Sequence, residues 1–295
     1  MIAPAGAAKR ELVELGVARL REMGYEVTVG AHALDSGPLY YAGRMEDRVG
    51  DLHAAFADST VDGIVCARGG WGSAELLPML DAELIRANPK VFVGYSDVTS
   101  LQVWMMERAG LVTFYGPMVA ADFARVEGVD LRSWGCAIAE SSAWSMDVGD
   151  GLRVLRAGVA EERLWGGCLS MVAESLGTPF APGARGGVLF LEDIGTKPYQ
   201  WDRMLVHLRY AGVLEGVTGI VFGDMQQNVG PEQMELLEGA LLHSLEWFRG
   251  PIAMGLRCGH VDGANRTLPL GVRVRLDCSD GFCPRVDFLE AAVTV

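Results

Sequence analysis

The sequence lacks the cysteine spacing of a zinc site. Its six cysteines include no CxxC pair, and the two nearest each other are Cys278 and Cys283. Paired cysteines are the usual mark of a structural zinc site, so this class of metal site is excluded. Cys66 lies in an apolar stretch and is interpreted as a buried thiol, and the cysteines and thirteen methionines suit a reducing compartment.

Positive charge is also scarce. The chain carries 25 Lys and Arg against 38 Asp and Glu, a formal net charge of −13. A nucleic-acid partner or an anionic membrane surface requires a basic face, so neither partner is expected. No apolar run is long enough to span a bilayer. At the start, Lys9 and Arg10 follow the short apolar piece, whereas in a signal peptide they precede it, so we expect a cytoplasmic location.

What the sequence does contain is alternating strand and helix patterns, with half of its residues hydrophobic. Residues 1–120 are expected to form an α/β domain with a parallel sheet covered by helices. Its strands are predicted in 1–4, 25–30, 61–67, 90–96 and 111–117, and its helices in 7–23, 45–57, 74–87 (divided at Pro78) and 97–108.

The pattern changes after that domain. Residues 121–165 show only short apolar pieces and are expected to connect two domains. Residues 166–295 are predicted to form a smaller β-rich domain with two helices, at 199–211 and near 231–248.

A serine stands at the predicted strand-to-helix turn of "VFVGYSDVTSL", residues 91–101. One interpretation is that Ser96 or Asp97 caps the helix. The other is that Ser96 is a nucleophile at an elbow, with the Asp97 amide and the helix N-terminus stabilising an oxyanion. The elbow lacks the second glycine of the G-x-S-x-G pattern, so the sequence leaves both interpretations open.

A base and an acid are also available at the ends of predicted strands. His260 opens the loop "GHVDGANRTLPLG" and is either a general base or a polar loop residue. Glu192 and Asp193 end the apolar strand "GVLFLED". A desolvated carboxylate there needs a partner, either a histidine or Arg203 in a structural ion pair.

A glycine-rich loop, "ARGGWGS", follows another predicted strand. Gly69 and Gly70 let backbone amides approach a ligand, which is a phosphate, an oxyanion or a peptide carboxylate. The loop has neither the Walker A pattern nor G-x-G-x-x-G spacing. Arg68 either pairs with a substrate carboxylate or is a structural arginine.

Six ordered motifs together resemble the LD-carboxypeptidase family of serine peptidases, which includes muramoyltetrapeptide carboxypeptidases and microcin C immunity peptidases. The motifs lie at 40–81, 89–101, 113–118, 164–180, 187–205 and 259–271. The resemblance implies a Rossmann-like N-terminal domain and a β-rich C-terminal domain. It further implies a homodimer that needs no metal or other cofactor.

The resemblance also implies site residues. GYSD places the nucleophile at Ser96, LFLED the acid at Glu192, and the GHVDGAN loop the base at His260. The backbone amides of Asp97 and Gly70 would form the oxyanion hole. Arg68, Gly69 and Trp71 are the expected substrate-binding residues.

Three positions depart from the usual family pattern. Trp71 replaces a tyrosine, Tyr115 replaces a frequent histidine, and Cys168 replaces an asparagine. The expected reaction is hydrolysis of the bond to a terminal D-alanine in murein tetrapeptides during wall recycling. The alternatives are a hydrolase of peptidyl-nucleotides, a muropeptide-binding protein without catalysis, and a nucleotide-binding Rossmann-type module.

Overall fold

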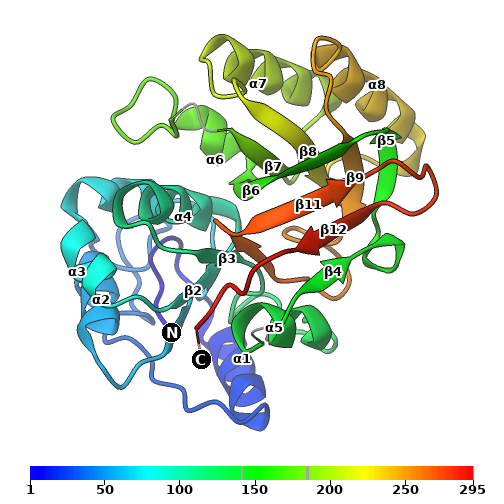
Figure 1. The fold of residues 1–295 in the computed structure, drawn as a ribbon. Helices are drawn as coiled ribbons and strands as arrows, with labels where there is room; N and C mark the ends of the chain where they lie inside the picture. Colours follow the sequence, from blue (N-terminus) through cyan, green and yellow to red (C-terminus); the bar gives the residue numbers. More distant parts are fainter. Residues whose placement is uncertain (141, 184–185, 295) are drawn as a thin grey trace. The chain divides into compact units, whose positions relative to one another are not determined.

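The computed structural model describes residues 1–140, 142–183 and 186–294, which form two compact units (Figure 1). Unit 1 comprises Met1–Ile138 and Gly263–Pro269, and unit 2 comprises Ala139–Asp262 and Leu270–Val295. The chain therefore crosses between the units three times. Residues 121–165, expected to be a connection, contain an α-helix, two complete strands and the first part of a third.

Unit 1 is built on a four-stranded sheet in the order β1-β2-β3-β10. Its strands are β1 (Gly63–Val65), β2 (Val91–Gly94), β3 (Thr113–Tyr115) and β10 (Leu268–Leu270). The pairs β1–β2 and β2–β3 are parallel, and Ile2 forms a parallel bridge to Cys66 beside β1. The expected parallel sheet of the N-terminal domain is confirmed.

The helices of unit 1 follow the predicted pattern in most places. They are α1 (Arg10–Glu22), α2 (Met45–Ala57), α3 (Ala82–Ala87), α4 (Thr99–Trp104) and α5 (Leu131–Ile138), and Figure 1 shows α2, α3 and α4 beside the sheet. The helix expected to divide at Pro78 is a 3₁₀ segment, Ser73–Met79, followed by α3. The strand predicted at 25–30 is wrong. Gly30 N–H donates to Met1 O (2.8 Å), but the segment forms no ladder with a neighbouring strand.

Unit 2 contains an eight-stranded mixed sheet in the order β4-β12-β11-β6-β7-β8-β9-β5. These strands are β4 (Trp144–Met146), β5 (Arg153–Arg156), β6 (Val159–Cys168), β7 (Gly187–Glu192), β8 (Val217–Gly223), β9 (Ile252–Leu256), β11 (Arg273–Asp277) and β12 (Arg285–Phe288). Strands β6 to β9 are parallel, and the outer strands pair antiparallel. The unit is strand-rich as expected, but it is as long as unit 1 rather than smaller.

The parallel strands of unit 2 are buried because helices cover them. These helices are α6 (Leu169–Glu174), α7 (Pro198–Tyr210) and α8 (Met234–Ser244), and α7 packs against α8. Every residue of β7 is buried, including Glu192 at its carboxyl end. Within the described residues, no helix is both long and apolar enough to cross a bilayer.

Gln102 of α4 ties the ends of two strands together in unit 1. Its side chain is fully buried, and Nε2 donates to Gly94 O at the end of β2 (3.0 Å) and to Phe114 O in β3 (2.8 Å). The Gly94 carbonyl immediately precedes the Tyr95-Ser96 turn. This amide therefore fixes the strand end from which the turn starts.

Replacing this amide with a hydrocarbon is expected to destabilise the fold. In Gln102→Leu, the Gly94 and Phe114 carbonyl oxygens both lose the Nε2 donor, although Gly94 O keeps the Gly116 N–H (3.2 Å). The lost bonds cost about 1–3 kcal/mol. The midpoint of urea unfolding should fall accordingly. Gln233→Leu, a change at an exposed glutamine whose side chain caps no helix, should leave the midpoint nearly unchanged. Equal midpoints for the two variants would contradict this role of Gln102.

Candidate active site

Ser96 has a backbone conformation that serines rarely adopt. It follows Tyr95 at the end of β2, and its φ is +64°, in the left-handed region. Such a conformation costs of order 1–3 kcal/mol for a residue with a side chain and is concentrated at functional sites. The Ser96 amide N–H donates to the phenol oxygen of the fully buried Tyr115 (3.1 Å). This bond helps to hold the turn.

Helix capping does not explain the Ser-Asp pair. The residues at the N-cap positions here are Tyr95, before the 3₁₀ turn Ser96–Val98, and Val98, before α4, and neither makes a side-chain cap. The Asp97 carboxylate instead accepts from Ser73 N–H of the glycine-rich loop (2.9 Å). Burial raises the pKa of Asp97, and the hydrogen bonds from Ser73 and Gly72 oppose that rise.

The glycine-rich loop lies directly against the serine turn. A Cβ atom placed on Gly69 would be 2.9 Å from Ser96 Cβ, 3.1 Å from its Oγ and 3.2 Å from the Asp97 nitrogen. Only glycine allows this approach. The structure thus brings together Gly69, Ser96 and Asp97, with Gly70 next along the loop.

The buried Arg48 binds the glycine-rich loop, and the sequence did not identify this residue as part of the site. Its side chain is 2% exposed, and Nη1 donates to Pro4 O (2.9 Å) and Gly72 O (2.8 Å). Nη2 pairs with Glu75 (2.8 Å). A signal was present: Arg48 is next to Val49 on the helix stripe that turns inward, where an arginine must find buried acceptors.

Arg68 and Trp71 are also in this loop, on its accessible side. The exposed Arg68 donates from Nη1 to Ala7 O (3.1 Å), and its Nη2 would be 3.4 Å from a Cβ on Gly70. Trp71 is 36% exposed. Both side chains are therefore available to a ligand of unit 1.

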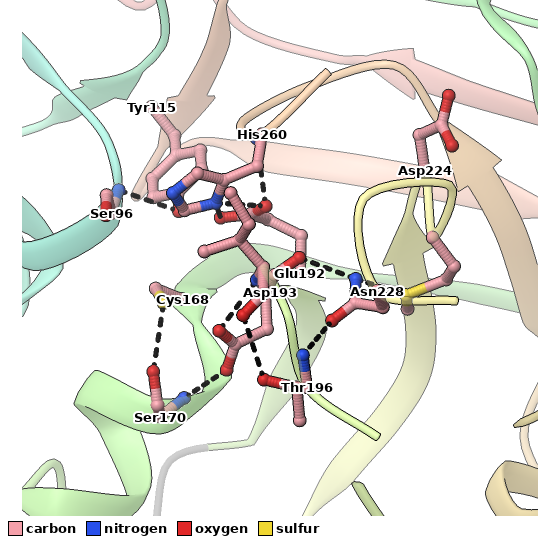
Figure 2. A network of polar contacts seen from close by, with 12 residues as sticks. Ser96, Tyr115, Cys168, Ser170, Glu192, Asp193, Thr196, Asp224, Asn228 and His260 are labelled. Carbon is pink, nitrogen blue, oxygen red and sulfur yellow. Dashed lines mark hydrogen bonds and ion pairs between the residues drawn. The ribbon is translucent and has the colours of Figure 1, made fainter. Parts of the chain in front are cut away.

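In unit 2, Glu192 and His260 form a hydrogen-bonded pair (Figure 2). His260 Nδ1 lies 2.9 and 3.0 Å from the two Glu192 carboxylate oxygens, and His260 N–H donates to Oε2 (3.0 Å). The Glu192 side chain is fully buried, and that of His260 is 12% exposed. With Nδ1 directed at the acid, the neutral ring carries its lone pair on Nε2, as a general base requires. The alternative partner, Arg203, is exposed on α7.

Gly259 makes the pair possible. Its φ is +96°, and a Cβ atom there would be 2.5 Å from Glu192 Cδ. A side chain at this position would displace the carboxylate or the His260 backbone. The glycine before the histidine therefore sets the acid–histidine geometry.

The Asp193 side chain binds backbone groups of neighbouring segments. Its carboxylate accepts from Ser170 N–H and Ile194 N–H (both 2.8 Å), and burial raises its pKa. Asn228, which the sequence analysis did not single out, donates from Nδ2 to Asp193 O (2.6 Å) and accepts from Thr196 N–H (3.0 Å). Figure 2 shows these groups beside Glu192. They fix the loop that follows the acid.

The candidate residues fall into two sets. Ser96, Asp97 and the glycine-rich loop with Arg68, Gly69, Gly70 and Trp71 belong to unit 1, whereas Glu192 and His260 belong to unit 2. Among the residues that the structure describes, no group of three or more His, Cys, Asp or Glu side chains is arranged to hold a metal ion. The chemistry available is that of a hydroxyl, backbone amides and an acid–imidazole pair.

Known proteins resemble this chain over nearly its whole length. It is 38% identical to a Streptomyces coelicolor protein named as a carboxypeptidase, covering 95% of this chain and 90% of the relative. It is 34% identical to a Bacillus subtilis protein named as a murein peptide carboxypeptidase, covering 100% and 92%.

Solved structures agree with these matches. The muramoyltetrapeptide carboxypeptidase of Oxalobacter formigenes superposes with a TM-score of 0.85 at 29% identity, covering 98% of each chain. An MccF-like protein from Bacillus anthracis gives a TM-score of 0.89 at 27% identity, covering 98% of this chain and 95% of that one. The expected α/β fold is therefore confirmed.

Family assignment rests on both domains. Residues 1–116 match the LD-carboxypeptidase N-terminal domain and residues 161–276 match the LD-carboxypeptidase C-terminal domain. The first match contains the serine turn and the glycine-rich loop, and the second contains the acid–histidine pair. Together with the full-length relatives, these matches show that the chain belongs to the LD-carboxypeptidase family and is a serine-type carboxypeptidase.

Proposed function

We propose that this carboxypeptidase hydrolyses the bond between an L-centre of a diamino acid and a terminal D-alanine in murein tetrapeptides. The observation that carries the proposed catalytic roles is the contact of His260 Nδ1 with both Glu192 carboxylate oxygens, which orients the ring with Nδ1 toward the acid and Nε2 on the opposite side. The substrate class is supported by the relative named as a murein peptide carboxypeptidase. Recycling of wall peptides in the cytoplasm is the proposed setting.

In the proposed mechanism, Ser96 is the nucleophile and His260 the base. Nε2 removes the Ser96 hydroxyl proton as Oγ attacks the carbonyl carbon of the scissile bond. His260 then gives this proton to the nitrogen of the departing D-alanine, leaving an acyl-enzyme. A water molecule, deprotonated by His260 Nε2, then attacks the acyl carbon. His260 returns this proton to Ser96 Oγ as the ester bond breaks and the tripeptide leaves. Glu192 orients the ring and stabilises its charged form.

The Asp97 and Gly70 amides are the proposed oxyanion hole. They would donate to the oxygen of the tetrahedral intermediate, beside the Ser96 turn that Gly69 approaches so closely. One such donor typically contributes about 2.7–4 kcal/mol to transition-state stabilisation. The other proposed contacts are Arg68 with the carboxylate of the substrate and Trp71 with its side chains.

The remaining proposals concern partners. A net charge of −13 supports a peptide substrate over nucleic acid, and no membrane partner is proposed. A homodimer is proposed from the family resemblance.

The first test is D-alanine release from the tetrapeptide L-Ala-D-Glu-meso-diaminopimelate-D-Ala. Wild type should release D-alanine, and Ser96→Ala should lower kcat/KM by about 10⁴ or more, because the nucleophile is lost. The matched control is Ser100→Ala, a serine one turn further along in α4, which should stay within about twofold of wild type.

A second candidate is a hydrolase of peptidyl-nucleotides. It is favoured by the likeness to the MccF-like protein from Bacillus anthracis. An aminoacyl-nucleotide conjugate should therefore be assayed beside the tetrapeptide. Cleavage of the conjugate alone would replace the murein proposal, and tetrapeptide binding without release by wild type would favour a muropeptide-binding protein.

Gly259→Ala tests the acid–histidine pair without removing a catalytic side chain. The added methyl group conflicts with Glu192 and with the positive φ, so His260 should shift and kcat should fall by about 100-fold or more. Gly263→Ala, in the same loop but with open space around the new Cβ, should retain wild-type kcat. Activity that is equal in the two variants would argue against Glu192 and His260 as the working pair.

A further inference from the structure

A pair of hydrogen bonds joins the glycine-rich loop to the serine turn within unit 1. Ser73 N–H donates to Asp97 Oδ2 (2.9 Å), and Ser73 Oγ donates to the Asp97 backbone carbonyl (2.5 Å). Ser73 is 0% exposed and Asp97 is 1% exposed. A carboxylate buried to this extent destabilises a fold unless its hydrogen bonds compensate for lost hydration. Asp97 therefore needs a structural or functional reason for being there.

Helix capping, the ordinary role of an aspartate at such a turn, does not explain this buried carboxylate. Asp97 does not cap a helix, since the N-cap positions are Tyr95 and Val98. Its side chain instead accepts from the N–H of Ser73, which lies 24 positions away in the sequence. The carboxylate thus serves the contact between two segments rather than its own helix.

One peptide group of the loop is fixed at both of its polar atoms. In the peptide that joins Gly72 to Ser73, the carbonyl oxygen accepts from Arg48 Nη1 (2.8 Å) and the N–H donates to Asp97 (2.9 Å). Such a peptide plane cannot rotate without losing a buried bond to a charged side chain. Gly70 lies just two residues before it, and Gly69 contacts the serine turn.

We propose that the Asp97 carboxylate and the Ser73 hydroxyl are positioning groups that fix the Gly70 amide relative to the Asp97 amide. This inference rests on the proposed function, in which those two amides form the oxyanion hole. Asp97 then acts twice: its N–H stabilises the oxyanion, and its side chain holds the loop that supplies the second donor. The Asp97 carboxylate and the Ser73 hydroxyl would position these amides and would not themselves touch the substrate.

The kinetic consequence is specific. Oxyanion donors act mainly in the transition state, so loosening them lowers kcat while KM changes little. Ser73→Ala should lower kcat about tenfold, and Asp97→Ala about 100-fold, since it also frees the Ser73 N–H. Asp97→Asn keeps an acceptor oxygen for that N–H and should recover most of the loss.

A matched control separates positioning from general destabilisation. Ser244 is a buried serine of α8 in unit 2 whose hydroxyl donates to Asp202 (2.7 Å). Ser244→Ala removes a comparable contact, and its kcat per folded enzyme should equal that of wild type. Tetrapeptide affinity should be the same for Ser96→Ala and Ser96→Ala/Ser73→Ala, because ground-state binding does not depend on the pair.

Hydrogen–deuterium exchange gives a readout independent of turnover. Peptides covering residues 67–75 should exchange faster in Ser73→Ala and Asp97→Ala than in wild type, but not in Asp97→Asn or Ser244→Ala. Unchanged exchange with unchanged kcat would overturn the inference, as would a raised KM at constant kcat. If wild-type enzyme releases no D-alanine, the proposed function fails, whereas loop exchange still reports on the Ser73–Asp97 contact.

Discussion

The positive φ of Ser96 is the constraint on which the candidate site in unit 1 depends. A left-handed serine is unfavourable by itself and persists only where its surroundings determine it. The Tyr115 phenol accepts from the Ser96 amide, and the Gln102 side-chain amide binds the end of β2. The Asp97 carboxylate binds the glycine-rich loop through Ser73 N–H. Together these contacts hold the strained Ser96 backbone, and the Ser96 hydroxyl lies at the end of a parallel strand.

Unit 2 meets a different constraint, the burial of a carboxylate. Glu192 ends a strand in which every residue is buried, so its carboxylate oxygens need hydrogen-bond donors from the protein. His260 supplies two, its ring Nδ1 and its own backbone N–H, and Gly259 provides the close approach. The same contacts that compensate for burial also orient the imidazole. Stability and the proposed catalytic geometry therefore coincide in this pair.

The sequence predicted those residues that follow buried strands, because position in a βα pattern is a local property. Ser96 and His260 follow apolar strands and Glu192 ends one, and functional residues are common at such strand ends and in the loops after them. Arg48, Ser73 and Asn228 were not recognised, since their partners lie 24 to 44 positions away in the sequence. The inward helix stripe marks Arg48 as buried, but it does not identify the acceptors that Arg48 binds. The strand predicted at 25–30 is wrong for the same reason, because an alternating pattern does not show whether another strand will pair with it.

The two units differ in what they bring to the proposed chemistry. Unit 1 offers neutral groups, a hydroxyl and backbone amides, whose value depends on distance and direction. Unit 2 offers an acid and an imidazole, whose value depends on charge and proton affinity. Displacement of the unit 1 groups would weaken stabilisation of the transition state. Displacement of the unit 2 pair would impair proton transfer. Positioning bonds therefore support both units: Ser73–Asp97 lies beside the proposed oxyanion amides, and Asn228–Asp193 lies beside the Glu192–His260 pair.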